Sequence, residues 1–202
     1  MNFATDITLE YERQTFKKIE LSQQKIKQKT FQECIFTQCT LNEVAFDNCK
    51  FFKCTFKDCD LNLMKVKNSV FSEVTFENTK VVGVNWMEAM WGKNNLLGSI
   101  NFTGCTLNYS TFIGLTLRKM KLVRCIAKDV DFAEADLTQA DCTGTDFTDS
   151  RFNHTNLTEA NFTDATHYNI SATENTLKKT RFSLPEAISL LHSLDIILKD
   201  AE

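Results

Sequence analysis

The 202-residue chain carries a formal net charge of −3, and 43% of its residues are hydrophobic. The hydrophobic content excludes a wholly disordered chain, and the mildly negative charge argues against a nucleic-acid-binding protein, which is usually basic. The sequence has 17 Phe but only six Gly and one Pro, so its turns must be built largely without the two residues that turns use most.

Residues 1–13 are expected to form a leader that caps the N-terminal end of the fold. This segment lacks the basic and then apolar pattern of a signal peptide, and no apolar run in the sequence approaches the length of a membrane span. We therefore expect a cytoplasmic protein. In that compartment the eight Cys are expected to remain reduced thiols.

From Phe16 onward a large apolar residue recurs at every fifth position, a period that matches neither an α-helix nor a β-strand. The first run comprises Phe16, Leu21, Ile26, Phe31, Phe36, Leu41, Phe46, Phe51, Phe56, Leu61, Val66, Phe71, Phe76, Val81, Trp86 and Trp91. The second run is shifted by one position and comprises Phe102, Leu107, Phe112, Leu117, Leu122, Ala127, Phe132, Leu137, Cys142, Phe147, Phe152, Leu157 and Phe162. The position two residues earlier is small or compact in most units, as in Cys34 and Ala135. Each unit is therefore expected to point one large and one small side chain inward.

These units resemble the pentapeptide-repeat family, whose repeat reads (A/S/T/C)-(D/N)-(L/F)-(S/T)-x and is matched in full by ADLTQ at residues 135–139. The resemblance covers about residues 15–165. It implies an all-β fold, a right-handed quadrilateral parallel β-helix over residues 14–183, in which four units make one square coil. Residues 20 apart should then stack at the β-ladder spacing of about 4.8 Å.

The central residues of this coil predict specific columns if one extra residue lies between Trp91 and Leu97, where the frame shifts. One column is expected to contain Phe16, Phe36, Phe56, Phe76, Leu97, Leu117, Leu137, Leu157 and Leu177. Another is expected to contain Phe31, Phe51, Phe71, Trp91, Phe112, Phe132 and Phe152. The irregular segment 84–99 permits two interpretations: a corner bulge that absorbs the shift, or a protruding loop whose Met87 and Met90 contact a partner.

Cysteine and histidine are not expected to form a catalytic or metal site. Five-residue spacing sends Cys49, Cys54 and Cys59 to three different sides of a coil, which excludes a tetrahedral zinc site. The three His accompany no Ser/His/Asp or Cys/His arrangement. We expect a protein that is not an enzyme and uses no cofactor.

Charges are segregated in the second half of the repeats. Residues 115–128 carry five basic side chains and no acidic one. Residues 129–164 carry only one basic side chain, Arg151, and nine acidic ones: Asp129, Asp131, Glu134, Asp136, Asp141, Asp146, Asp149, Glu159 and Asp164. Two interpretations stay open. The repeat's own preference for Asp before the central residue shapes the turns, or the carboxylates form an acidic belt that binds a basic groove of a partner.

Residues 184–202 are expected to form a helix that caps the C-terminal end of the rod. Ser183 and Glu186 are spaced as in a capping box, with Pro185 in the first turn, and predict an α-helix from Glu186 to Lys199. Its apolar surface exceeds what one rod end needs, so part of it is expected to pair with a second copy. The residues concerned are Ala187, Ile188, Leu190, Leu191, Leu194, Ile196, Ile197 and Leu198.

The C-terminal segment resembles one subgroup of the family through Tyr168, Asn175 and FSLPEA at residues 182–187, followed by Leu190 and Leu191. This subgroup is the Qnr-like proteins, which include the quinolone-resistance proteins and the microcin B17 immunity protein. The resemblance implies a homodimer joined through its C-terminal helices, whose rod imitates B-DNA and engages DNA gyrase or topoisomerase IV. The alternatives are a scaffold for an unrelated protein partner, including a secreted effector, and a toxin-specific immunity protein.

Overall fold

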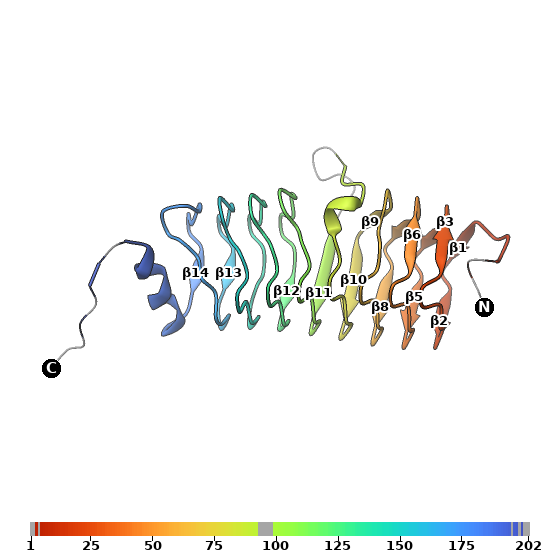
Figure 1. Cartoon of the computed structure of the whole chain (residues 1–202), viewed down its shortest axis with the longest axis horizontal. Coiled ribbons are helices and arrows are strands. Elements are labelled where there is room, and N and C mark those ends of the chain that lie inside the picture. Colours follow the sequence, from red (N-terminus) through yellow and green to blue (C-terminus); the bar gives the residue numbers. More distant parts are fainter. Residues whose placement is uncertain (1–2, 4, 93–98, 195, 198, 200–202) are drawn as a thin grey trace.

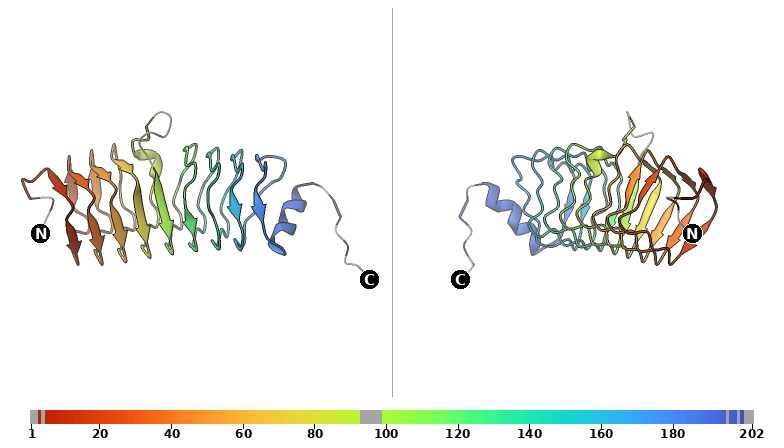
Figure 2. Two further views of the ribbon diagram at one scale, coloured as in Figure 1. Left: turned by 180° about the vertical axis from the view of Figure 1, so that it is seen from behind. Right: turned by 45° about the vertical axis from the view of Figure 1, so that its right-hand side comes forward.

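The computed structural model describes all residues of the chain except 1–2, 4, 93–98, 195, 198 and 200–202. The chain winds into a stack of coils, and its two termini lie at opposite ends of the resulting rod (Figure 1). The coils follow one another at regular intervals along the rod, and a helix lies at the C-terminal end (Figure 2). The predicted fold class, an all-β right-handed quadrilateral parallel β-helix, is confirmed.

The four sides of the coils form four faces, which we call A to D in chain order. Face A holds a parallel sheet of β1 (Glu10–Glu12), β4 (Thr30–Gln32), β7 (Lys50–Phe52) and β9 (Val70–Ser72). Face B holds β2 (Thr15–Lys17), β5 (Ile35–Thr37), β8 (Thr55–Lys57), β10 (Val74–Glu77), β11 (Ile100–Thr103) and β12 (Leu122–Val123), then the pair β13 (Asn161–Phe162) and β14 (Arg181–Phe182). Face C consists of isolated bridges in the column Glu20, Thr40, Asp60, Lys80, Thr106, Ile126, Asp146 and Thr166. Face D begins with β3 (Lys25–Lys27) and β6 (Ala45–Asp47) and continues through helix η1 (Trp86–Glu88) and bridges in the column Asn85, Thr111, Asp131 and Arg151.

Nearly all described central residues point into the rod, as predicted, and stack on their counterparts in the next coil, whereas Trp91 and Leu177 are only partly buried. On face B, Phe16 pairs with Phe36, Phe36 with Phe56 and Phe56 with Phe76. The rings of Phe36 and Phe56 are parallel, with centroids 4.6 Å apart, and those of Phe56 and Phe76 are 5.2 Å apart. Dispersion between stacked rings adds to the burial of apolar surface, so each coil is stabilised by its neighbours.

The predicted columns are wrong beyond Phe76. Phe76 pairs with Phe102, 26 positions later, whereas the preceding pairs are 20 positions apart. The frame shift therefore consists of six additional residues in place of one. Trp86 and not Trp91 stacks on Phe112, with ring centroids 6.0 Å apart, and Leu97 lies outside the described residues. Most central residues are Phe or Leu, so similar side chains align in more than one register.

The turns explain how the chain manages with so few Gly and Pro. In nearly every described unit, the residue two positions after the central one has a positive φ, as in Lys18 at 54° and Glu134 at 59°. This left-handed conformation costs a residue other than glycine about 1 kcal/mol or more. The cost is offset because the same residue donates its backbone N–H to the next coil: Lys18 to the carbonyl of Thr37 at 3.0 Å, and Glu134 to that of Asn153 at 2.8 Å.

The small inward residue of each unit connects two coils when it carries a hydroxyl or thiol. Ser69 Oγ accepts a hydrogen bond from the backbone N–H of Cys49 at 3.0 Å and donates one to the carbonyl of Phe46 at 3.1 Å. The backbone N–H of Cys39 likewise donates to Cys59 Sγ at 3.4 Å. These bonds satisfy backbone groups that are buried where the coils turn, which is why Ser, Thr and Cys suit this position.

The N-terminal end is closed by residues ahead of the repeats. The ring of Phe3 packs edge-on against Phe16 at 4.9 Å and Phe31 at 5.4 Å, and the buried ammonium group of Lys29 donates to the carbonyls of Asp6 and Thr8. Strand β1, which begins at Glu10, already pairs with β4, ahead of residue 14 where the repeats were expected to start.

The C-terminal helix, η3 (Glu186–Leu194), is a 3-10 helix, where an α-helix through Lys199 was predicted. The predicted capping box is not formed. Ser183 Oγ accepts instead from the backbone N–H of Asp164 at 2.9 Å, and the Glu186 carboxylate accepts from the backbone N–H of His167. Both side chains therefore bind the helix to the last coil and do not cap the first turn of the helix itself.

Candidate functional site

The nine acidic residues expected to form the belt fall into two positions of the repeat. Four precede the central residue and are half-buried: Asp131, Asp136, Asp141 and Asp146. The other five are exposed at corners of the coil, where the backbone has a positive φ: Asp129, Glu134, Asp149, Glu159 and Asp164. The two groups differ in hydrogen bonding and in charge compensation, so they cannot share one role.

The half-buried group shapes the turns. The Oδ1 atoms of Asp136 and Asp141 accept from the backbone N–H of the residue two positions later, Thr138 at 3.0 Å and Thr143 at 3.2 Å. The hydroxyl groups of the same two Thr donate to the same oxygens at 2.5 Å. Asn156 accepts equivalent bonds from its own downstream Thr. Because an uncharged Asn does the same work, the turn needs the side-chain oxygen and not its charge.

Most of this group is also paired with cations of adjacent coils. Arg118 lies 2.6 Å from Asp136, and Arg151 lies 3.5 Å from Asp131. Asp146 is paired with Lys128 at 3.3 Å, and the Nδ1 atom of His167 lies within hydrogen-bond distance of its carboxylate at 2.9 Å. Burial would raise the pKa of Asp146, but the hydrogen bonds from Thr148, His167 and Lys128 outweigh it and lower the pKa to about 2. The charge of these carboxylates is thus largely compensated within the rod.

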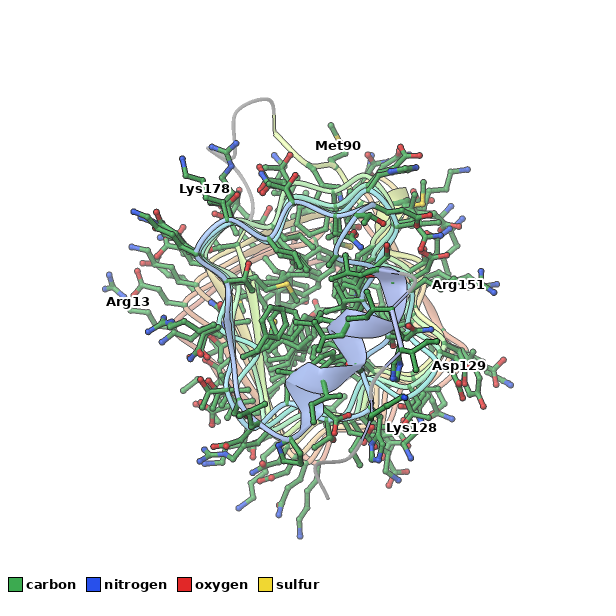
Figure 3. The ribbon with its side chains drawn as sticks, turned by 90° about the vertical axis from the view of Figure 1, so that its left-hand side faces the viewer. Arg13, Met90, Lys128, Asp129, Arg151 and Lys178 are labelled. Atoms are coloured by element: carbon green, nitrogen blue, oxygen red, sulfur yellow. The ribbon has the colours of Figure 1, made fainter. Side chains whose placement is uncertain are left out.

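The exposed group includes three carboxylates at the two edges of face D. Asp129 and Asp149 lie 20 positions apart at the corner between faces C and D, and Glu134 lies at the corner between faces D and A. Among the residues that the structure describes, none of the three forms an ion pair. Viewed along the rod, Asp129 and Arg151 project from one side and Arg13 from the opposite side (Figure 3).

A shallow depression of about 310 Å³ lies among these acidic side chains. Tyr109, Asp129, Asp131, Asp149 and Arg151 line it. In the described part of the chain no group of three or more His, Cys, Asp or Glu converges as metal ligands. Open, polar and divided between adjacent coils, the depression suits contact with another macromolecule better than enclosure of a small molecule.

Met87 and Met90 lie where the rod departs from its regular repeat. Both side chains are exposed, by 49% and 55% respectively, and Met90 projects away from the rod axis (Figure 3). The indole N–H of Trp91 donates to the carbonyl of Trp86 at 2.8 Å and fixes the chain just after them. The two Met therefore offer apolar contact area beside the edge between faces D and A.

The residues expected to form a dimer interface expose apolar side chains at the C-terminal end of the rod. Ala187, Leu190 and Leu191 are half-buried, whereas Ile188 and Leu194 are exposed. Past the end of η3, Ile197 is 87% exposed, and Leu198 lies outside the described residues. Exposed apolar side chains gathered at one end are typical of a surface covered by another molecule.

The eight thiols are free and buried. Burial raises the pKa of Cys54 to about 12 and that of Cys49 in the same direction, so the Cys49 and Cys54 side chains stay protonated at neutral pH and lack the reactivity of a thiolate. Among the described residues, no helix is long and apolar enough to cross a membrane.

Comparison with known proteins accounts for the repeat. A family model described as "Pentapeptide repeat region" matches residues 29–97 and 90–162. The chain belongs to the pentapeptide-repeat family. No curated protein matches the sequence.

This pentapeptide-repeat rod has the fold of QnrB1, described as a plasmid-mediated fluoroquinolone resistance protein. One structure of a trypsin-treated QnrB1 variant is 19% identical, with a TM-score of 0.62, and the match covers 96% of this chain and 100% of that one. The structure of a second trypsin-treated variant is 18% identical, with a TM-score of 0.65, and the match covers 92% of this chain and 100% of that one. At this identity the likeness shows the fold.

Sequence reasoning missed how the pentapeptide-repeat rod arranges charge on face D, because the length of the insertion decides it. Each side of a coil takes five residues, and the predicted insertion was five residues too short. That error turns the second half of the rod by one side relative to the first. Only the correct register puts Lys65 and Lys67 on the same face as Asp131.

Proposed function

We propose that this protein is a non-catalytic rod that binds a type II topoisomerase, DNA gyrase or topoisomerase IV, and modulates or protects it from inhibitors. The exposed carboxylates of Asp129, Glu134 and Asp149 would take the place of DNA phosphates in the enzyme's basic groove. The observation that carries the proposal is that these three charges stand at the edges of one face without an ion pair in the described structure. The shared fold with a fluoroquinolone resistance protein supports the choice of partner.

The proposed assembly is a homodimer joined at the C-terminal ends. Ile188, Leu194 and Ile197 expose apolar surface there, and an isologous pair would remove it from water. Such a dimer would also bring the two acidic halves next to each other, so that the carboxylates extend over both rods as phosphates extend along a duplex.

A scaffold that binds a different protein is the second candidate. It is favoured by the ion pairs of Asp131, Asp136 and Asp146, because these leave fewer free carboxylates than a phosphate-like surface would use. In that case the half-buried Asp serve only the turns and the ion pairs within the rod, and a topoisomerase would not recognise it.

Binding to purified gyrase and topoisomerase IV at low and high salt, about 50 and 200 mM, separates the two candidates. Contacts between exposed charges are screened over about 8–10 Å at physiological ionic strength, so the affinity of the proposed complex should fall steeply with added salt. The triple variant Asp129→Asn, Glu134→Gln, Asp149→Asn should lose most of the affinity. A matched control, Glu20→Gln, Asp58→Asn, Glu73→Gln, removes the same charge from exposed positions of the first half and should bind as the wild type does.

Absence of salt-sensitive binding in the wild type would exclude the topoisomerase proposal and leave the scaffold. Equal losses in both triple variants would show that net charge matters and that the edges of face D do not.

A further inference from the structure

Face D carries opposite charges in its two halves. In the first half its outward positions hold four exposed lysines: Lys25, Lys27, Lys65 and Lys67. Asp47 is the acid among them and pairs with Lys25 at 3.1 Å, and the edges of this half carry Glu43 and Glu88. In the second half the face and its edges hold Asp129, Asp131, Glu134 and Asp149, with Arg151 as the exposed cation. A surface that is basic at one end and acidic at the other is complementary to itself when reversed.

The middle of the same face is apolar. Leu63 is 52% exposed and Tyr109 is 67% exposed, and both lie at the corner between faces C and D. Met87 directly follows Trp86, the central residue of its repeat on face D. Gly83 lies between Leu63 and Tyr109 on that corner, with φ at 69°, and a Cβ there would lie 2.6 Å from Leu63 Cδ2. A hollow of about 340 Å³ adjoins it, lined partly by Leu63, Gly83 and Lys65.

We propose that face D pairs with face D of a second copy, the two rods antiparallel about a twofold axis that crosses the face between Asn85 and Thr111. These two residues are bridged neighbours in adjacent coils, so the axis lies midway along the described face. The residues that one coil contributes to face D form a row across the face. Rotation about this twofold axis places the row of Lys65 and Lys67 against the row of Asp131, and the row of Asp47 against the row of Arg151.

The corners support the same register. A twofold axis of this kind keeps the corner between faces C and D opposite its own copy, so Tyr109 of one rod meets Gly83 and its hollow in the other. Glu134 comes opposite Asn68, one position from Lys67. The basic row of Lys65 and Lys67 thus meets the acidic row of Asp131, and the exposed Tyr109 ring meets Gly83, which has no side chain. Specific interfaces combine charge and shape complementarity in this way.

The proposed arrangement places one pair of like charges opposite each other. Glu43 comes opposite Asp149, and like charges face to face weaken an interface. Glu43→Lys should therefore strengthen the association several-fold, an effect that a general increase in positive charge elsewhere on the rod would not produce. The same change would weaken a partner interaction that used Glu43 as a carboxylate.

Zero-length carbodiimide cross-linking of the full chain at low ionic strength tests the pairing. In one chain the rows of Lys65 and Asp131 are three coils apart, about 14 Å at the β-ladder spacing. A direct amide bond between Lys65 or Lys67 and Asp129, Asp131 or Glu134 therefore requires two chains. Mixing unlabelled and ¹⁵N-labelled protein identifies such bonds by mass. We expect them at about 50 mM salt and expect at least a roughly tenfold loss at about 1 M.

Charge reversal gives the matched variants. Lys65→Glu with Lys67→Glu should abolish the cross-links and lower the mass found by sedimentation. Asp129→Lys with Glu134→Lys should do the same, and a mixture of the two variants should restore the association. Lys17→Glu with Lys57→Glu makes an equal change on the opposite face B and should leave it intact.

Cross-links confined to other residue pairs, or a mixture of variants that fails to associate, would overturn this interface. The pairing covers Asp129 and Glu134, which the proposed function assigns to a topoisomerase, so one rod forms either complex but not both through these carboxylates. The assay contains no topoisomerase, so failure of the cross-links would overturn the pairing and leave the proposed function standing.

Discussion

Two substitutions of Asp146 distinguish what its side-chain oxygen contributes to the turn from what its charge contributes to the ion pairs. Its Oδ1 accepts from Thr148, through the backbone N–H at 3.1 Å and the hydroxyl at 2.6 Å, and the carboxylate also pairs with Lys128 and His167. Asp146→Asn keeps an oxygen for the turn, as Asn156 and Asn161 do, and loses only the ion pairs. Asp146→Ala loses both kinds of contact.

The two costs follow from the contacts. Exposed ion pairs contribute about 0–1 kcal/mol, and each net hydrogen bond contributes about 1 kcal/mol. Asp146→Asn should therefore lower the free energy of unfolding by about 0.5–1 kcal/mol and Asp146→Ala by about 2–3 kcal/mol, as measured by urea denaturation at neutral pH. In about 1 M NaCl the loss in the Asn variant should disappear, while that in the Ala variant should persist.

The charge also predicts a pH dependence. Because the folded pKa of Asp146 is about 2 and the ordinary value is 3.8, the carboxylate stabilises the fold at neutral pH, and its contribution is lost as pH falls from 3.8 through about 2. The Asn variant should lack this component of acid destabilisation. Equal losses of stability in the Asn and Ala variants at low salt would show that the hydrogen bonds of the turn and the ion pairs do not contribute separately.

Further predictions concern the core and the ends. Phe56→Ala, which removes a fully buried ring stacked on two others, should cost about 3–5 kcal/mol in urea denaturation, and a loss below about 1 kcal/mol would contradict the stacking. All eight Cys should resist alkylation in the native protein and react after unfolding without reductant, as counted by mass spectrometry; fewer than eight modified thiols would reveal a disulfide. At about 1 M salt, where pairing through face D is screened, deletion of everything after Ser183 should yield monomers or aggregates in light scattering, and an unchanged soluble dimer would place the dimer contact elsewhere.

The repeat made most of the fold predictable. A large residue at every fifth position specified inward side chains, and the burial of Phe16, Phe36 and Phe56 in one column follows from four such units in each coil. The corner residues could be placed too, because they occupy a constant position in the unit. Periodicity of this kind is a local property and needs no knowledge of contacts between coils.

The register across the irregular segment could not be predicted. Phe76 stacks equally well on a Leu or a Phe, so side-chain size did not distinguish an insertion of one residue from one of six. The charge pairs between coils depend on that register and on side-chain reach. The pairing of Arg118 with Asp136, 18 positions later, has no local sequence signal.

The C-terminal helix shows another limit. The spacing of Ser183 and Glu186 is that of a capping box, but both side chains accept from the last coil, whose N–H groups lack a further coil to bind. The need to satisfy those groups outweighed the local pattern, and no property of the segment itself records that need.

Competition with DNA shows whether the rod occupies the DNA-binding groove of gyrase. Labelled duplex DNA bound to gyrase is titrated with the rod, and its release is followed by fluorescence anisotropy. We predict that the wild-type protein displaces the DNA at low salt and that the variant Asp129→Asn, Glu134→Gln, Asp149→Asn does not. DNA that stays bound while saturating rod is present would contradict the claim that this protein occupies the place of DNA.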